Sequence, residues 1–212
     1  MLNDSIKRAL DIILSSILFI IFSPLIILTA ILIKFDSEGP LLADTPMRVG
    51  KNGKLFKMYK FRSMVRDAHE VLTENPKYKK LYEQYKKSGY KLKDDPRITK
   101  VGKIIRKYSV DEIPQFVNVL RGDMSIVGPR AYYADELREQ QKEYPNTRNE
   151  VKIVLSVKPG ITGVWQVSGR SGINFDKRIK MDALYAKKKS VLYDLYIIAK
   201  TPLAMLSGKG AM

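Results

Sequence analysis

The sequence predicts an α+β fold that is predominantly helical, with an N-terminal membrane helix, a β-hairpin and amphipathic helices at the membrane surface. Three observations support this: an uncharged apolar segment at 12–33, an Asn-Gly pair between two short apolar and basic runs, and several later stretches with helical periodicity. The length of 212 residues suits one compact domain with a small addition. We therefore divide the chain into a membrane segment, 1–34, and a soluble-type domain, 35–212.

The apolar segment has three interpretations. Its 22 uncharged positions, at about 1.5 Å per residue, would cover roughly one hydrocarbon thickness as a straight spanning helix. Ser23 and Pro24 at its midpoint favour a second interpretation, because proline removes a helical hydrogen bond and kinks the helix. Each arm would then reach half a bilayer, and the segment would enter and leave one leaflet. A signal peptide is the third, but this segment is too long and lacks a small-x-small cleavage site.

Basic residues flank both ends of this segment. Lys7 and Arg8 precede it, and Lys34 and Arg48 follow it. Because positive charges near membrane segments favour the cytoplasm, both ends are expected on that side, which a re-entrant helix satisfies. Spanning helices with a kink are also common, so both topologies remain open at this stage. The domain that follows is expected to face the cytoplasm.

The soluble-type domain is predicted to begin with the hairpin and to continue with helices. The hairpin arms are 41–48 and 55–64, joined around Asn52 and Gly53. Periodicity predicts one helix over 66–87. This stretch is rich in lysine and tyrosine. The lysines could form an ordinary solvated face, or the lysines and tyrosines together could form a surface that binds anionic headgroups. The bend at 159–163 is interpreted as a turn. Further helices are predicted at 97–107, 114–120, 132–144, 176–189 and 191–206.

Charge and composition narrow the chemistry. The chain has 38 Lys and Arg against 22 Asp and Glu, a formal net charge of +16, so a polyanion is the expected partner. It has no cysteine, and His69 is its one histidine, which excludes disulfides, thiol catalysis and most histidine-based triads. The motifs GxxxxGK[ST], GxGxxG, GxSxG and HExxH are absent from the sequence. Asp, Glu, Lys, Arg, Tyr and Ser remain as candidates.

The acidic pair Asp111 and Glu112, in RKYSVDEIPQFVNVL, is the first candidate site. Ser109 and Glu112 match a capping box, so the pair could simply start a helix. That interpretation places Pro114 at the fifth helical position, whereas proline favours the first. A helix that starts near Pro114 leaves both carboxylates just ahead of it. Helix N-termini suit anions and phosphates, so catalysis by this pair is the alternative.

Several basic residues are further candidates for the site. Each could either form an ordinary surface ion pair or bind a phosphate group. Turns such as Gly128-Pro129-Arg130 and Ser168-Gly169-Arg170 hold arginines rigidly, and a guanidinium matches two phosphate oxygens. The later carboxylates Asp176, Asp182 and Asp194 are candidates for holding a divalent ion, although none lies at a diagnostic spacing. The cations concerned are Lys60, Arg62, Arg106, Arg130 and Arg170.

Four sequence blocks stand out along the chain: GKLFKMYKFRSM, GKIIRKYSVDEIPQFVNVLRGDMSIVGPR, KPGITGVWQVSGR and the late YDLY. Together they resemble the bacterial sugar transferase family of monotopic phosphoglycosyl transferases. The resemblance runs from Lys7 to about Asp194 and is most specific in the block around the acidic pair. In that family an N-terminal helix broken at Ser-Pro enters and leaves one leaflet, which matches Ser23 and Pro24.

The resemblance implies transfer of a sugar 1-phosphate from a UDP-sugar to polyprenyl (undecaprenyl) phosphate with release of UMP, the first membrane step of glycoconjugate assembly. Asp111 is then the nucleophile, with Glu112 beside it. Phosphate chemistry, rather than a motif, predicts Mg²⁺ as the cofactor, held by Asp111, substrate phosphates and, as a further ligand, Glu112. The resemblance places the catalytic domain on the cytoplasmic face of the bacterial inner membrane, with anionic lipids as partners and no nucleic acid. The implied substrate-binding residues are Lys60, Arg62, Arg106, Arg130, Arg170 and Asp194.

Ala131, Trp165 and Ser168 depart from the family pattern, and the segment 41–46 lacks the phenylalanine and glutamine that are usual before the Arg-x-Gly of the hairpin. They concern recognition of the nucleotide and sugar more than the chemistry. The segment 68–93 is longer than in the shortest members, and the resemblance implies no role for it. Two other functions remain: a non-catalytic basic module that binds the membrane surface, and a glycosyl transferase that releases UDP. The sequence specifies neither the sugar nor the oligomeric state.

Overall fold

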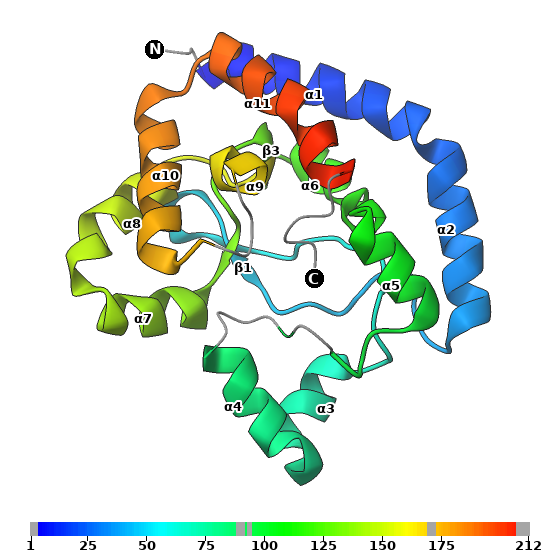
Figure 1. Cartoon of the computed structure of the whole chain (residues 1–212). Coiled ribbons are helices and arrows are strands. Elements are labelled where there is room, and N and C mark those ends of the chain that lie inside the picture. Colours follow the sequence, from blue (N-terminus) through cyan, green and yellow to red (C-terminus); the bar gives the residue numbers. More distant parts are fainter. Residues whose placement is uncertain (1–3, 88–91, 93–94, 169–172, 207–212) are drawn as a thin grey trace.

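The computed structural model describes residues 4–87, 92, 95–168 and 173–206. Helices dominate it, and two small sheets lie among them, which confirms the α+β class and the predominance of helix (Figure 1). The N-terminal helices run along the top and down the right of the view in Figure 1, and α3 (Ala68–Glu74) and α4 (Lys79–Lys87) project at the bottom.

The N-terminal segment forms two helices, α1 (Asp4–Ile21) and α2 (Ser23–Asp36). They are bent by 59° at the break, where Pro24 lies in the first turn of α2 and the Ser23 hydroxyl donates to the Ile20 carbonyl at 2.8 Å. Within the part of the chain that the structure describes, no single helix is long and apolar enough to cross a membrane, whereas α1 and α2 together meet that test. The predicted break at Ser23 and Pro24 is therefore confirmed.

The predicted hairpin forms, but its ladder is short. Strands β1 (Arg48–Val49) and β2 (Leu55–Phe56) pair antiparallel around η1 (Lys51–Gly53). Asn52 and Gly53 have φ of +57° and +80°, the left-handed region that Asn and Gly tolerate best. Beyond the ladder, the arms meet again at one isolated bridge, Leu42 with Phe61.

The prediction of a helix from Tyr132 is wrong at its start. Residues Tyr132 and Tyr133 form β4 (Tyr132–Tyr133), which pairs with the free edge of β1 to give the order β2-β1-β4. Helix α7 (Ala134–Glu143) follows directly. Two tyrosines are compatible with a strand as well as with a helix. Here they form a strand because the edge of β1 offers unpaired backbone groups for hydrogen bonding.

The turn predicted at 159–163 is instead a strand. β5 (Gly160–Thr162) pairs in parallel with β3 (Ser125–Val127). The two chains approach so closely that a Cβ at Gly160 would lie 2.0 Å from the Gly128 nitrogen, and one at Gly128 would lie 2.5 Å from the Lys158 carbonyl oxygen. The glycines are therefore needed for close backbone contact between two segments that are far apart in sequence.

The single helix predicted over 66–87 is wrong. The chain forms α3 (Ala68–Glu74), a short turn η2 (Pro76–Tyr78) and α4 (Lys79–Lys87). Asn75 is extended, as expected for a residue before proline, and its side chain accepts a hydrogen bond from the Lys77 backbone at 3.0 Å. Pro76 therefore ends one helix and starts the next.

The other predicted helices are confirmed within a few residues. They are α5 (Lys100–Lys107), α6 (Gln115–Arg121), α10 (Phe175–Lys188) and α11 (Val191–Leu206). Three helical elements between α7 and α10 were not predicted, because at one or two turns they carry little periodicity. These are η4 (Pro145–Thr147), α8 (Arg148–Leu155) and α9 (Val164–Ser168).

The main core joins α1 and the start of α2 to the rest of the chain. Phe116 and Val119 of α6, Ile126 of β3 and Ile197 of α11 are buried together, and the inner face of α1 packs on them. The buried Asp11 carboxylate accepts hydrogen bonds from the Ser125 hydroxyl and the Ile126 backbone, at 2.8 and 3.0 Å. Helix α1 is thus anchored to β3 by both apolar packing and polar contacts.

Candidate functional site

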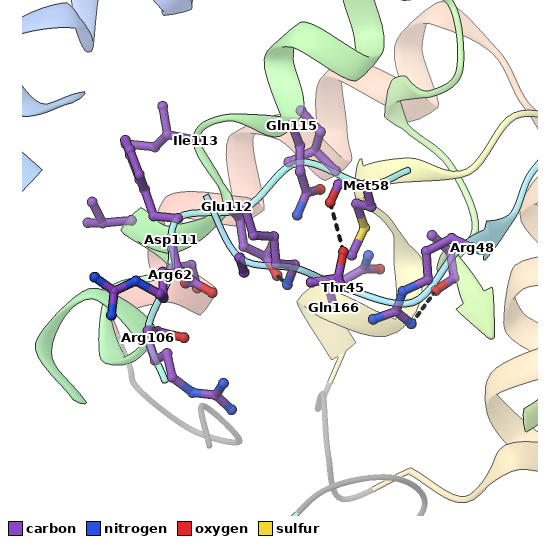
Figure 2. A pocket seen from close by; sticks show the side chains of 18 of the residues that line it. Thr45, Arg48, Met58, Arg62, Arg106, Asp111, Glu112, Ile113, Gln115 and Gln166 are labelled. Carbon is purple, nitrogen blue, oxygen red and sulfur yellow. Dashed lines mark hydrogen bonds and ion pairs between the residues drawn. The ribbon is translucent and has the colours of Figure 1, made fainter. Parts of the chain in front are cut away.

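Six of the predicted site residues line one cavity of about 710 Å³. Its walls come from the hairpin arms, the segment between α5 and α6, the loop after β3, and α9 (Figure 2). The volume lies in the range that small-molecule sites occupy. The six residues are Lys60, Arg62, Arg106, Asp111, Glu112 and Arg130.

The acidic pair lies in a single helical turn, η3 (Val110–Glu112), between α5 and α6. The Ser109 side chain makes no capping hydrogen bond, so the capping box that its spacing allows does not form. Helix α6 begins at Gln115, directly after Pro114. The predicted helix start near Pro114 is therefore confirmed, and both carboxylates lie just ahead of it.

Ser109 carries local strain that orients the pair. Its φ is +56°, a left-handed conformation that costs a non-glycine residue roughly 1–2 kcal/mol. We predict that Ser109→Gly keeps or raises the melting temperature, whereas Ser109→Val lowers it, because a β-branched residue tolerates this conformation least. Thermal unfolding of the two variants checks this. Equal melting temperatures for both would contradict the strain.

The Asp111 side chain is almost buried, at 7% exposure. Burial, which disfavours the charged form, raises its pKa to about 6; the neighbouring Lys60 opposes the rise and Glu112 adds to it. Among the described residues, none forms an ion pair within 4.0 Å of this carboxylate. The Asp111 carboxylate is thus partly desolvated and has no ion-pair partner among the described residues.

Glu112 is engaged by the hairpin. The Lys60 ammonium lies 2.6 Å from its carboxylate, and the backbone of the next residue, Phe61, donates to the Asp111 carbonyl at 2.9 Å. The buried Asn118 holds the same arm, since its side chain accepts from the Tyr59 backbone at 2.8 Å. The sequence does not predict this role of Asn118, because a single asparagine within an amphipathic helix gives no sign of a distant partner.

The two arginines nearest to Asp111 differ in their contacts. Arg62 donates to the Ser37 hydroxyl and carbonyl and to the Pro40 carbonyl, so its guanidinium clasps the end of α2. It points away from the Asp111 carboxylate (Figure 2). Arg106, in the last turn of α5, lies beside Asp111, and its charge favours the ionised carboxylate. Arg106 therefore suits an anionic ligand better than Arg62 does.

Arg130 lies in the loop after β3 and contacts two buried carboxylates, Asp182 and Glu136. Its backbone N–H donates to Asp182 at 3.1 Å, and its guanidinium lies 3.9 Å from Glu136. Its guanidinium also lies over Trp165, 5.4 Å from the ring centroid. These contacts position Arg130 in the cavity wall.

Glu136 and Asp182 belong to a buried charge cluster. Arg178 donates to Glu136 at 2.9 Å, and the Tyr132 hydroxyl donates to Asp182 at 3.1 Å. Burial raises the pKa of Asp182 to about 7, against the opposing effect of the Arg130 backbone N–H. Asp182, predicted as a candidate metal ligand, is thus engaged in holding the Arg130 loop. Glu136 was not predicted, because nothing in its helical context distinguishes it from a surface glutamate.

The structure places the remaining candidates away from the cavity wall. The Asp194 carboxylate accepts from Lys7 at 2.6 Å and from the Tyr185 hydroxyl at 2.7 Å, which ties α1 to α11. Asp176 lies on α10, 4.0 Å from Lys180. Arg170 falls outside the described residues. Within the described ranges, no group of three or more acidic or histidine side chains gathers as a metal site.

The tyrosine-rich segment 68–87 also contributes to the cavity wall. Tyr85 of α4 lines it, together with His69 and Leu92. The Arg97 guanidinium lies 5.7 Å from the Tyr85 ring centroid and is itself paired with the buried Asp95. Burial raises the pKa of Tyr85 far above its ordinary value. The segment 68–87 therefore forms one wall of the site, a role that its composition alone did not indicate.

Comparison with known proteins gives consistent matches along the chain. Residues 2–208 match the profile of the family described as bacterial sugar transferase. An undecaprenyl-phosphate galactose phosphotransferase of Salmonella typhimurium is 43% identical over 97% of this chain and 41% of its own length. The exopolysaccharide production protein ExoY of Rhizobium meliloti is 38% identical, over 97% of this chain and 87% of its own.

A third relative has a more specific name. The UDP-glucose:undecaprenyl-phosphate glucose-1-phosphate transferase of Escherichia coli is 35% identical over 94% of this chain and 40% of its own length. The chain thus spans about two fifths of the Salmonella and Escherichia proteins and most of the Rhizobium protein. With a match to the family profile over nearly its whole length, the chain belongs to the bacterial sugar transferase family.

Proposed function

We propose that this protein is a phosphoglycosyl transferase that moves a sugar 1-phosphate from a UDP-sugar to polyprenyl phosphate and releases UMP. The observation that carries this proposal is the buried Asp111 carboxylate, which has no ion-pair partner among the described residues and shares a cavity with Lys60, Arg106 and Arg130. The names of relatives support it, since two are called undecaprenyl-phosphate sugar phosphotransferases and one of these names a UDP-sugar.

In the first step, an Asp111 carboxylate oxygen attacks the phosphorus that carries the sugar. The bond between this phosphorus and the oxygen bridging to the nucleotide phosphate breaks, and UMP leaves with that oxygen. A phosphosugar-aspartyl enzyme remains. The burial of Asp111 favours this step, because a poorly solvated carboxylate is a stronger nucleophile than one in bulk water.

In the second step, a phosphate oxygen of the polyprenyl phosphate attacks the same phosphorus. The bond to the Asp111 oxygen breaks, the carboxylate is regenerated, and the lipid leaves carrying a diphosphate-linked sugar. Two separate steps suit substrates that arrive from water and from the membrane, since only one needs to bind at a time.

The cations of the cavity stabilise the charge that develops on the phosphoryl oxygens. Arg106 and Arg130 approach from α5 and from the loop after β3, and Lys60 connects the hairpin to Glu112. Fixed positive groups in a partly dry cavity stabilise such charge strongly. We assign Arg62 and Asp194 supporting roles, because their side chains hold α2 and α1 in place.

The acidic pair fits Mg²⁺ bound mainly through substrate phosphates. Asp111 and Glu112 supply two adjacent carboxylates, which is the small protein donor set that Mg²⁺ commonly uses alongside waters and phosphates. Bound there, the ion would neutralise diphosphate charge. Lys60, whose ammonium lies 2.6 Å from the Glu112 carboxylate, would hold that carboxylate in place.

We further propose that α1 and α2 form a re-entrant hairpin in the inner membrane and that the catalytic domain lies on its cytoplasmic face against anionic lipids. The 59° bend and the exposed apolar side chains of both helices support this. Because the chain has no cysteine, single cysteines at Ser5 and Glu38 are expected to react with an impermeant thiol reagent from the same side. Labelling from opposite sides would contradict re-entry.

The identity of the released nucleotide tests the proposed reaction. With a UDP-sugar and polyprenyl phosphate, the purified protein is expected to release UMP and to form a diphosphate-linked lipid sugar. UDP as the product would indicate a glycosyl transferase that cleaves the sugar carbon-oxygen bond. Formation of neither nucleotide with any UDP-sugar tested would indicate a binding module.

The pKa of Asp111 predicts a pH dependence. Because only the ionised carboxylate attacks, we expect kcat/KM for the donor to fall about tenfold per pH unit below pH 6. Glu112→Gln removes a neighbouring negative charge, so the inflection of the pH profile should move to lower pH. Measured UMP release from pH 4.5 to about 8 checks both expectations. An inflection that moves to higher pH in the variant would contradict the assignment.

A further inference from the structure

A second cavity lies beside the first turns of α1, apart from the cavity that contains Asp111. Its volume is about 210 Å³, and no residue that the structure describes lines both cavities. This volume lies below the range that whole small-molecule ligands need, so the second cavity suits a single small group. Its lining includes five cationic side chains and two carboxylates. They are Lys7, Arg8, Lys51, Lys158 and Lys189, against Asp4 and Asp11.

Both carboxylates of the second cavity are already engaged by the protein. Asp11 accepts hydrogen bonds from β3. Asp4 lies 2.5 Å from Lys189 and 3.6 Å from Lys51. Lys7 has a counter-charge in Asp194, at 2.6 Å. Two of the five cations, Lys7 and Lys189, therefore have a close carboxylate, whereas Lys51 shares its carboxylate with Lys189.

The two remaining cations, Arg8 and Lys158, meet at the end of α6. Arg8 donates to the Val119 and Leu120 carbonyls at 2.5 and 2.8 Å, and the same guanidinium carries further N–H groups. A Cβ at Gly122 would lie 3.5 Å from the Lys158 ammonium and 3.6 Å from an Arg8 nitrogen, so both charged groups border the space beside this glycine. Over the described ranges, no carboxylate forms an ion pair with Lys158.

The surroundings of Lys158 disfavour its charged form. Burial lowers the pKa of Lys158, and the positive charges of Arg8 and Lys51 lower it further, against the opposing effect of Asp11 and Asp123. Cations that converge on one space repel each other, and an anion between them turns this repulsion into attraction. A group with negative charge and several acceptor oxygens would therefore fit among these three cations.

The second cavity also lies next to an apolar surface of α1. Ile6, Leu10 and Ile13 lie on one face of this helix and are exposed. In Figure 1 the first turns of α1 lie beside the start of α11, where Lys7 contacts Asp194. With this apolar face in lipid, the adjacent cavity lies at the depth of the lipid headgroups.

We propose that the second cavity binds a phosphate group, with Lys158, Arg8 and Lys51 as its ligands. Phosphate supplies the charge and the acceptor oxygens that match ammonium and guanidinium donors. The apolar face beside the cavity favours the headgroup of an anionic lipid as the source of this phosphate, and free phosphate is the other source of the same group. The site is separate from the proposed reaction, because its lining residues are not those of the Asp111 cavity.

The reactivity of individual lysines in the full-length wild-type protein tests this site. A bound phosphate covers the ammonium groups and keeps them protonated, which slows their modification by an amine-acylating reagent. At saturation, we expect Lys158 and Lys51 to react at least about fivefold more slowly, as measured by peptide mass spectrometry. Lys54 and Lys152 are exposed and do not line the cavity, so their rates should change less than about twofold.

Two probes distinguish the sources of the phosphate. Inorganic phosphate is added to the protein in detergent, and phosphatidylglycerol is added to phosphatidylcholine vesicles that carry the protein. Protection by phosphatidylglycerol, with or without protection by inorganic phosphate, supports a headgroup site. Protection by inorganic phosphate alone supports a site for the free anion.

A matched pair of variants shows whether the lysines act as one site. Lys158→Gln removes a proposed ligand, whereas Lys152→Gln removes the same charge from an exposed position of α8. Protection of Lys51 should fall below about twofold in Lys158→Gln and persist in Lys152→Gln.

Two results would overturn the inference. One is the absence of protection at Lys158 with both probes, and the other is equal protection of Lys54 and Lys152, which indicates general attraction to a basic surface. The labelling rates do not depend on turnover. A wild-type protein that releases no UMP would therefore overturn the proposed function alone.

Discussion

Asp111→Asn is expected to lower UMP release and sugar-phosphate transfer at least about a thousandfold, because the amide cannot form the acyl-phosphate link. Binding of the UDP-sugar should persist, since Lys60, Arg106 and Arg130 remain. Initial rates with a coupled UMP assay, and donor binding by calorimetry, measure the two effects separately. Residual turnover above about one tenth of wild type would contradict the nucleophile assignment.

The same substitution should stabilise the folded protein at neutral pH. The folded-state pKa of Asp111, about 6, lies above its ordinary value of 3.8, so folding favours the protonated acid. The stability that the group contributes is present below pH 4 and is lost as the pH rises through 6. Asparagine avoids the cost of a buried charge, so Asp111→Asn should be more stable by about 1–3 kcal/mol at pH 7.5, with the advantage lost near pH 4.

Glu139→Gln is the matched control for this effect. Glu139 is 55% exposed on α7, so neutralising it should change neither the rate nor the melting temperature appreciably. A melting temperature of Asp111→Asn at or below that of wild type at pH 7.5 would contradict the desolvated carboxylate.

Glu136→Gln is expected to have the largest effect on stability. Its carboxylate is completely buried, lies 2.9 Å from Arg178 and also faces Arg130. Neutralising it leaves a buried guanidinium without its counter-charge, which costs about 3–5 kcal/mol. Chemical unfolding should show this loss. Because the same carboxylate holds Arg130, KM for the donor should rise as well.

Two comparisons make the Glu136 prediction specific. Glu139→Gln, one turn along the same helix, should lose less than about 0.5 kcal/mol. The double variant Glu136→Gln with Arg178→Met should recover at least half of the loss, because it removes both buried charges. Equal stability of the single and double variants would show that the pair is not coupled.

The parts of the fold that the sequence predicted are those with local signals. Asn52 and Gly53 specify the hairpin turn by their backbone preferences, and Pro24 specifies the break between α1 and α2. Periodicity over three or more turns predicted α10 and α11 within one residue. In these cases the local preference and the tertiary structure agree.

The parts that the sequence did not predict depend on contacts between distant segments. Gly160 looks like a turn residue, and it forms a strand because Gly128, 32 positions earlier, permits a close parallel approach. The strand at Tyr132 exists because β1 leaves an edge open. Pro76 interrupts the lysine and tyrosine periodicity of 66–87, because a proline cannot continue the helix before it.

The candidate site shows the same division. The acidic pair and its nearby cations lie in short motifs, which is why six of the predicted residues meet in one cavity. Glu136 and Asn118 contact partners that are far away in the sequence, so the residues next to them do not indicate their roles. Asp194 lies in a motif too, but its partners Lys7 and Tyr185 place it at the anchor of α1.

The most direct measurement is the intact mass of the protein after incubation with a UDP-sugar and Mg²⁺, with acceptor withheld. We predict a mass increase of one sugar phosphate, located on the peptide that contains Asp111, discharged on addition of polyprenyl phosphate and absent from Asp111→Asn. Release of UMP at the full rate upon acceptor addition, without any such adduct on the enzyme at earlier times, would contradict the covalent mechanism.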